Sequence, residues 1–399
     1  MSIENRDFLI TSPQTWEYPV QTTIKNTTLE ISKKNRVIYI NTPLDIMTNH
    51  RKPDTEEFHH RRDVLGGKLP LVRQINPNLW VVDCPFILLS INKLPKGKIF
   101  DFFNWLNNKK LANYIKKVLK DLGFHDVIHL MDTDIYRGFY MKDLLKPALS
   151  IYYCRDYVIG EPYFARHGVR LEAELARKSD FVLANSTHFA ERFRQYNPKT
   201  YAIETGVNVD LYKGTDNHPK PADMEGIPHP IIGYTGVLYT LRLDLPLMYE
   251  WAKSNPDKSF VLVGPEDDQF KAHEIHNLPN VFFLGKKPVE ELPAYMQHFD
   301  VCINPQAIND ITIGNYPLKI DEYLCMGKPV VATRTHTMMD IFSKHTHLAE
   351  GLEEYNQQLE IALSEVGMSV LSEARMAFGE SHSWGHSVGK IYKAIEENQ

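Results

Sequence analysis

Short apolar segments alternate with polar or amphipathic stretches along the whole chain, and this alternation restricts the fold more than any other feature. In the first half, apolar strand-like segments occupy residues 7–12, 36–43, 80–85, 126–131, 148–154 and 180–186. Helices are expected between them, over residues 20–33, 111–122 and 171–178. Strands that alternate with helices form a mostly parallel sheet with right-handed crossovers. The first half therefore predicts a doubly wound, Rossmann-like α/β domain.

The same pattern restarts after residues 213–230, a segment with four prolines and two glycines that we interpret as a linker. Further strands are expected at residues 230–236, 259–265, 280–285, 299–305 and 329–333. Because 399 residues exceed one ordinary core, we predict two domains, over residues 1–212 and 231–382. The last helix, within residues 383–399, has no strand after it and is expected to pack on the first domain.

Composition excludes several classes of protein. A net charge of −5 does not favour nucleic acid as a partner. The four cysteines form no CxxC pair, which fits reduced thiols in the cytoplasm. The first residues, MSIENRDFLITSPQ, predict no secretory signal, and apolar runs such as 85–91 are too short to span a membrane. No Gly-x-Ser-x-Gly, Walker loop or G-x-G-x-x-G is present, so hydrolase, kinase and dehydrogenase functions are disfavoured.

The segment GNYPLKIDEYLCMGKPVVAT, residues 314–333, predicts a helix that starts where a parallel strand ends. Asn315 is the expected N-cap, and Pro317 suits the first turn. Free N–H groups at such a terminus attract anions, and Gly314 would let a phosphate approach. Lys319 and Glu322 share one helical face. They form either part of a ligand site or a solvated ion pair.

Several segments together resemble a known family. PLKIDEYLCMGKPVVAT (317–333), LPNVFFLGKKPVEELPAYMQHFDVCINP (278–305) and PIIGYTGVLYTLRLDL (230–245) resemble the donor domain of GT-B-fold glycosyltransferases. The similarity is greatest to the retaining family-4 group and its teichuronic-acid-type branch. RVIYINTP (36–43), SIYYCRDY (150–157), LEAELARKSDFVLANS (171–186) and ETGVNVDLY (204–212) extend it into the first half. The resemblance implies two Rossmann-like domains that face each other across a cleft.

The resemblance also assigns roles to residues. It implies that Glu322 holds the ribose hydroxyls of a nucleotide sugar and that Arg242 grips the departing diphosphate. His129 matches a histidine near the donor sugar, and Lys319 could supply a second cation. Arg242, His129 and Lys319 are therefore the expected catalytic residues. The expected donor-binding residues are Gly236, Val237, Gly264, Leu284, Gly285, Lys286, Ile313, Gly314, Asn315 and Glu322.

Some positions depart from the family pattern. Gly314 stands where the family has a second acid, and Val237 stands where an arginine often follows the glycine. The first strand is followed by SPQTWEYP (12–19) instead of a Gly-Gly loop. The hinge region around Glu204-Thr205 and Asn208 also differs. Acceptor binding therefore cannot be transferred from the resemblance.

The resemblance implies transfer of a sugar from a UDP- or GDP-sugar to a saccharide or a lipid-linked saccharide. It further implies retention of anomeric configuration and a role in surface polysaccharide biosynthesis. We expect no metal and no other cofactor, because Asp132-Thr133-Asp134 is explained more simply as the cap of a turn. The alternatives are a nucleotide-sugar 2-epimerase and a non-catalytic nucleotide-sugar-binding protein.

Two regions of the first domain suggest further partners. Arg155, Asp156 and His167, with Glu161 and Arg166 nearby, either contact an acceptor or form a salt-bridged loop. Residues 93–120 carry eight lysines and one acid beside Phe100, Phe102, Phe103 and Trp105. The apolar stripe from Leu111 to Leu122 suggests core packing, while the lysines and aromatic side chains suit an anionic membrane. We therefore expect a cytoplasmic protein that can contact the membrane face.

Overall fold

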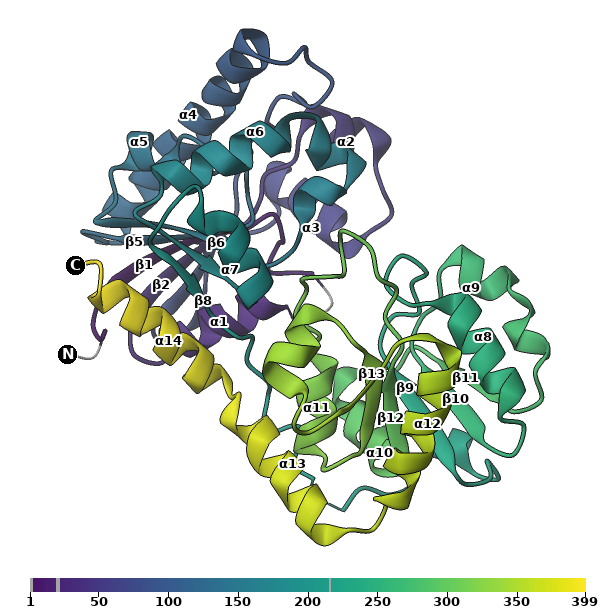
Figure 1. Cartoon of the computed structure of the whole chain (residues 1–399). Helices are drawn as coiled ribbons and strands as arrows, with labels where there is room; N and C mark the ends of the chain where they lie inside the picture. The colour runs from purple at the N-terminus through teal and green to yellow at the C-terminus, as the bar shows by residue number, and fades with distance from the viewer. Residues whose placement is uncertain (1–2, 19–21, 215–216) are drawn as a thin grey trace. The chain divides into compact units, whose positions relative to one another are not determined.

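The chain consists of two compact units. The computed structural model describes residues 3–18, 22–214 and 217–399 (Figure 1). Unit 1 comprises Met1–Glu204 and Ser387–Gln399, and unit 2 comprises Thr205–His386. The segment predicted as a linker does not separate the units. Its described part belongs to unit 2, where Met224 and Ile227 are buried in the core; residues 215–216 lie outside the described part.

Unit 1 is built on an eight-stranded sheet with the order β3-β4-β2-β1-β5-β6-β7-β8. Its strands are β1 (Asp7–Thr11), β2 (Arg36–Ile40), β3 (Val72–Asn76), β4 (Leu79–Val82), β5 (Ile128–Asp132), β6 (Leu149–Cys154), β7 (Phe181–Ala184) and β8 (Thr200–Ala202). All neighbouring strands are parallel except β3, which pairs antiparallel with β4 at the sheet edge. The carboxyl ends of the parallel strands therefore meet at one edge.

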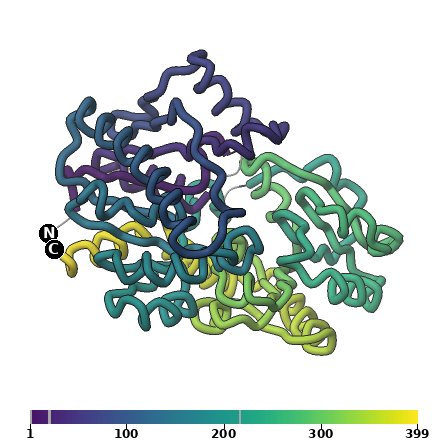
Figure 2. Tube along the Cα trace, turned by 90° about the horizontal axis from the view of Figure 1, so that it is seen from above, coloured from purple at the N-terminus to yellow at the C-terminus, as the bar shows by residue number. Residues whose placement is uncertain are grey.

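Helices cover both faces of this sheet. On one face, α1 (Thr23–Ser32) and α14 (Trp384–Glu396) pack against β1, β2 and β5. In Figure 2 the yellow C-terminal helix accordingly lies beside the purple N-terminal strands. On the other face lie α4 (Lys98–Asp121), α6 (Pro162–Lys178) and α7 (Thr187–Arg194). Shorter helices, α2 (Ile46–Arg51), α3 (Glu56–Leu65) and α5 (Met141–Leu145), occupy the connections.

Unit 2 repeats the plan with a fully parallel, six-stranded sheet of order β11-β10-β9-β12-β13-β14. The strands are β9 (Ile231–Thr235), β10 (Ser259–Val263), β11 (Val281–Gly285), β12 (Val301–Asn304), β13 (Val330–Thr333) and β14 (His347–Ala349). On one face lie α8 (Leu245–Ser254), α9 (Asp268–Ala272) and α12 (Gly351–Ser364). On the other lie α10 (Leu292–Gln297) and α11 (Lys319–Cys325), and α13 (Ser369–Ser381) packs on α11.

The predicted strands lie where the sequence placed them, whereas several helix boundaries differ. The helix expected over residues 20–33 is α1, which starts at Thr23; residues 20–21 lie outside the described part. The predicted cap at Asn315 is wrong: α11 starts at Lys319, after turns between Thr312 and Asn315 and between Pro317 and Ile320. The chain therefore forms turns at the positions where the local sequence pattern predicted the start of a helix. Among the helices of the described residues, none combines the length and apolar character that spanning a membrane requires.

Candidate functional site

Two loops at the carboxyl edge of the unit 2 sheet are joined by hydrogen bonds. The first follows β9, and the second follows β12. Ala307 N donates to Arg242 O at 3.0 Å, and Asp244 N donates to Pro305 O at 2.9 Å. Asn309 Nδ2 adds a bond of 2.8 Å to Leu241 O. Because backbone and side-chain bonds join the loops, the Arg242 segment is held against the loop that leads into α11.

Glycines let the backbone approach closely at this edge. Gly236 and Gly264 follow β9 and β10 with φ angles of 135° and 156°, which side chains rarely adopt. A Cβ atom at Gly264 would lie 1.8 Å from Gly236 O, so no larger residue fits there. A Cβ atom at Gly236 would lie 3.0 Å from the Lys319 Nζ atom. The ammonium of Lys319 therefore rests almost against the Gly236 backbone.

Tyr234, the fourth residue of β9, holds this ammonium. Lys319 Nζ donates to the Tyr234 hydroxyl at 2.5 Å and lies 4.0 Å from the centre of its ring. The same hydroxyl donates to Val237 O at 3.1 Å. Tyr234 thus links the first residue of α11 to the loop after β9. Sequence reasoning missed Tyr234, because a tyrosine in a buried strand looks like an ordinary core residue.

Glu322 and Lys319 carry opposite charges in a poorly solvated place. Burial raises the pKa of Glu322 to about 7, although Lys319 and the Tyr212 hydroxyl favour its ionised form. Burial lowers the pKa of Lys319 to about 7; nearby Glu322 opposes this shift and Arg242 adds to it. Arg242 itself is exposed. The structure therefore brings together three of the predicted residues, Arg242, Lys319 and Glu322, at the edge where parallel sheets bind ligands.

One buried acceptor in the same segment has no partner. Asn315 is 8% exposed, and its Oδ1 atom makes no hydrogen bond within the described residues. Leaving a buried polar atom unpaired costs about 1–3 kcal/mol. A ligand that donates a hydroxyl or N–H group to Asn315 would remove this cost. This unpaired atom belongs to the residue that was predicted as a helix cap and that caps no helix in the structure.

Residues 230–363 match the protein family described as Glycosyl transferases group 1. The chain carries a glycosyl transferases group 1 domain. This domain contains β9 to β14 and, apart from Tyr212, the residues gathered around Lys319. The family match and the cluster around Lys319 thus fall in the same unit.

Sequence and structure relatives agree with this assignment. The chain is 24% identical over 231 residues to TuaH of Bacillus subtilis (strain 168), a glycosyltransferase named for teichuronic acid biosynthesis. That alignment covers 56% of this chain and 58% of TuaH, so it spans little more than half of the relative.

Solved structures match nearly the whole chain. Sucrose-phosphate synthase of Thermosynechococcus elongatus matches with a TM-score of 0.69 and 15% identity, covering 99% of this chain and 100% of that one. HepE of Anabaena, solved with UDP and glucose, matches with a TM-score of 0.62 and 16% identity over 98% and 100%. At such identities these neighbours establish the fold, which is that of the GT-B glycosyltransferases.

The remaining positions predicted to bind the donor lie along the same sheet edge. Leu284 and Gly285 end β11, which is two strands away from β9 in the sheet order, and Lys286 follows it. Gly285 has a φ angle of 70°, and Lys286 is exposed. Val237 is 56% exposed. Ile313 is partly exposed, next to the buried Gly314.

The residues predicted in unit 1 are placed differently. His129 was expected to end its strand, but it is the second residue of β5 and is fully buried. Its Nε2 atom lies 2.9 Å from Thr11 Oγ1, and burial lowers its pKa to about 4. A neutral, enclosed imidazole of this kind supports the core of unit 1, so we do not include His129 in the site.

The acceptor-side residues are also engaged within unit 1. Arg155 is 8% exposed and donates through two nitrogens to Asp132, which is itself fully buried. His167 is 4% exposed; its ring stacks on Phe100 at 3.8 Å, and Nε2 lies 3.0 Å from a backbone oxygen. Asp156 is partly buried. Arg155 and His167 thus have structural partners within unit 1.

The two carboxylates of the Asp132-Thr133-Asp134 motif form ion pairs with arginines. Asp132 accepts from Arg155 and from Ser12 Oγ at 2.7 Å. Asp134 accepts from Arg137 Nε at 2.8 Å. Asp134 Oδ1 also accepts from Arg137 N at 3.1 Å and so caps the turn that follows, whereas Asp132 is the last residue of β5.

Proposed function

We propose that this chain is a glycosyltransferase that takes a sugar from a nucleoside-diphosphate sugar. The observation that carries the proposal is the Arg242, Lys319 and Glu322 cluster inside the group 1 domain. HepE, which shares the fold, has been solved with UDP-glucose, and this supports a UDP-sugar as donor. TuaH supports a saccharide or lipid-linked saccharide acceptor in surface polysaccharide biosynthesis.

In this proposal, Arg242 and Lys319 compensate the negative charge of the departing diphosphate. Glycosyl transfer passes through an oxocarbenium-like state while negative charge grows on the leaving group. Loop hydrogen bonds fix the Arg242 backbone, and Tyr234 holds the Lys319 ammonium before the charge develops. Such preorganised donors lower the barrier because they need no rearrangement. Diphosphate binding would also favour the charged form of Lys319, whose pKa burial has lowered.

In this proposal, Glu322 and Asn315 bind the hydroxyl-rich part of the donor. In this proposal Glu322 accepts from ribose hydroxyls, which favours its ionised form. Asn315 offers its buried Oδ1 atom to a donor sugar hydroxyl or a nucleobase N–H. Retention of configuration belongs to the proposal through the family-4 resemblance. Gly314, in place of the family's second acid, leaves this part of the pocket less charged.

A thermal-shift screen over UDP, GDP and their sugars tests the donor class. We expect one nucleotide to raise the melting temperature by several degrees and the shift to be lost in Glu322→Ala. Slow release of free sugar identifies a transferase, while interconversion of sugars identifies an epimerase. Binding without any turnover, even with saccharide acceptors, would leave a non-catalytic binding protein.

The proposed transfer uses no metal at the diphosphate, because Arg242 and Lys319 supply the positive charge there. Calorimetric titration of UDP should therefore give the same affinity with and without EDTA. Nucleotide binding that EDTA abolished and Mn²⁺ restored would contradict this part.

We also propose that unit 1 contacts an anionic membrane from the cytoplasmic side. Ile99 and Phe102, at the start of α4, are 52% and 56% exposed and lie among lysines of the 93–120 segment. Phe100 does not take part, because it is fully buried against His167. Vesicles containing phosphatidylglycerol should pellet the protein, and Phe102→Ser should weaken pelleting. Equal pelleting by phosphatidylcholine alone, or none, would reject the contact.

A further inference from the structure

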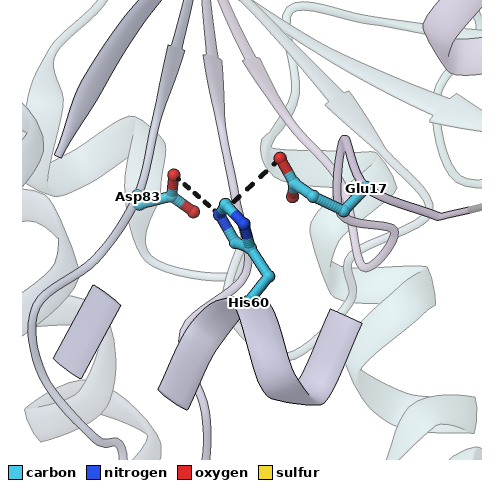
Figure 3. A group of neighbouring side chains, drawn as sticks. All are labelled: Glu17, His60 and Asp83. Carbon is cyan, nitrogen blue, oxygen red and sulfur yellow. Dashed lines mark hydrogen bonds and ion pairs between the residues drawn. The ribbon is translucent and has the colours of Figure 1, made fainter. Parts of the chain in front are cut away.

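Three potential metal ligands meet at the carboxyl edge of the unit 1 sheet (Figure 3). One ligand atom each from Glu17, His60 and Asp83 lies within 4.8 Å of the other two. His60 Nε2 is 3.1 Å from Asp83 Oδ2 and 3.7 Å from Glu17 Oε1. The side chains are only 11%, 13% and 1% exposed for Glu17, His60 and Asp83 respectively. This is a converging cluster below the surface rather than a chance group of exposed acids.

The fold brings these ligands together from separate elements. Glu17 lies in the loop after β1, Asp83 directly follows β4, and His60 projects from α3. Asn41, directly after β2, donates its Nδ2 group to Glu17 Oε2 and to Asp83 Oδ1, both at 2.8 Å. Asn41 therefore fixes one oxygen of each carboxylate. The other two oxygens, Oε1 and Oδ2, face His60 and the guanidinium of Arg73.

The charge of the cluster is incompletely balanced. Two carboxylates share the space, and Arg73 of β3 supplies one guanidinium, whose NH2 atom contacts Glu17 Oε1 and lies 3.3 Å from Asp83 Oδ2. Among the side chains in direct contact, two carboxylates face one guanidinium, and the charges of Lys25 and Arg61 also act on Glu17. Buried carboxylates need compensation, which a bound cation would complete. Arg73 is 27% exposed, so its side chain can move out towards solvent.

We propose that Glu17 Oε1, His60 Nε2 and Asp83 Oδ2 bind a divalent first-row transition-metal ion, with Zn²⁺ as the reference case. One imidazole nitrogen and two carboxylate oxygens suit Zn²⁺, whereas Mg²⁺ takes oxygen ligands. Three protein ligands leave a position for water or for a substrate oxygen. The ion displaces Arg73 and ties the loop after β1 and helix α3 to β4. It is separate from the donor chemistry proposed for unit 2.

Arg73 distinguishes this proposal from a self-contained ion network. If the guanidinium is only a competitor for the same oxygens, its removal should strengthen metal binding. If the network needs no metal, Arg73→Met merely destabilises unit 1 and creates no affinity for Zn²⁺. Asn41 gives a further distinction, because losing a group that orients metal ligands weakens affinity about 10- to 100-fold.

The test is calorimetric titration of the untagged full chain with Zn²⁺, and separately with Mg²⁺. His59 is the matched control, since it lies on α3 beside His60 and pairs with the exposed Asp54 at 2.8 Å. We expect one Zn²⁺ site that survives His59→Ala, disappears in His60→Ala and tightens about ten-fold in Arg73→Met. Glu17→Gln should also remove it, which covers the case in which His60→Ala does not fold.

Three results would overturn the proposal: equal Zn²⁺ binding by the His59→Ala and His60→Ala variants, no Zn²⁺ binding by the wild-type chain, or weaker binding by Arg73→Met. Mg²⁺ binding as tight as Zn²⁺ binding would show that the His60 nitrogen is not a metal ligand. None of these titrations contains a nucleotide. Failure of the metal site and failure of the donor proposal therefore remain distinguishable.

Discussion

The two units place charged side chains at the same edge of similar sheets but treat them differently. In unit 1 the acids face guanidinium groups: Asp132 meets Arg155, and Asp134 meets Arg137. In unit 2, Lys319 rests on the neutral hydroxyl and ring of Tyr234, while Glu322 is hydrogen-bonded by Tyr212. The pKa values of Lys319 and Glu322 move towards each other because burial disfavours both charges.

In our proposal, this difference separates groups that stabilise the fold from groups that bind a ligand. A buried acid with a bidentate arginine gains its compensation inside the protein. We propose that desolvated Lys319 and Glu322 gain their compensation fully only when a ligand brings opposite charge or hydroxyl groups. We therefore expect that removing charges lowers the unfolding free energy in unit 1 but does not lower it in unit 2.

The largest effect is expected in unit 1, from Arg155→Ala. It leaves the fully buried Asp132 without its guanidinium, which costs about 3–5 kcal/mol of unfolding free energy. Urea unfolding together with hydrogen exchange of the β5 and β6 amides measures the loss. Adding Asp132→Asn should recover much of it, since no uncompensated charge then remains. An Arg155→Ala chain as stable as wild type would show that the pair is not structural.

In unit 2, Arg242→Ala should affect the reaction rather than the fold. Because the side chain is exposed, we expect the unfolding free energy to change by no more than about 0.5 kcal/mol. Loss of one preorganised donor to the leaving group should lower kcat about 10²- to 10³-fold. Arg334→Ala is the control, because Arg334 pairs with Glu354 in the same unit at 2.6 Å. An unchanged kcat in Arg242→Ala would remove Arg242 from the mechanism.

Removing both desolvated charges of unit 2 should stabilise the protein. The folded pKa of Lys319 is lowered to about 7, so its buried charge lowers the unfolding free energy most at and below pH 7. This destabilisation decreases as pH rises from 7 towards the unfolded pKa near 10.4. Glu322 has a raised folded pKa of about 7, so the stability it confers at low pH is lost as pH rises from about 4.3 to 7. Both effects are unfavourable near pH 7.

The double variant Lys319→Met/Glu322→Gln should therefore gain about 0.5–2 kcal/mol near pH 7 while losing nucleotide binding. Differential scanning calorimetry and UDP titration measure the two quantities. A double variant less stable than wild type would mean that the pair supports the fold, as the ion pairs of unit 1 do.

The sequence was informative where local pattern and fold agree. The two mostly parallel sheets and the position of Glu322 and Lys319 on one helix followed from strand alternation and motif spacing. The loop carrying Arg242 followed from the family resemblance. Tyr234, Tyr212 and the partners of Asp132 could not be predicted, because they meet through crossovers that spacing does not encode. The Glu17, His60 and Asp83 cluster was missed for the same reason, since its members come from three separate elements.

The smallest effect is expected in the pH dependence of nucleotide affinity. A diphosphate needs the ammonium form of Lys319, so affinity should fall as pH rises above the Lys319 pKa of about 7. Ribose hydroxyls need the carboxylate of Glu322, so affinity should also fall as pH drops below the Glu322 pKa of about 7. Each limb should be worth about two- to ten-fold, the contribution of one hydrogen bond.

Titration of UDP between pH 5.5 and 9 separates the two groups. Lys319→Arg keeps its charge at all these pH values and should flatten only the alkaline limb. Glu322→Gln should flatten only the acid limb, while Asp132→Asn in unit 1 should leave both limbs unchanged. If Lys319→Arg still loses affinity above pH 7, the alkaline limb belongs to another group. The ammonium on Tyr234 would then be a packing feature of unit 2 and not the counterpart of the bound diphosphate.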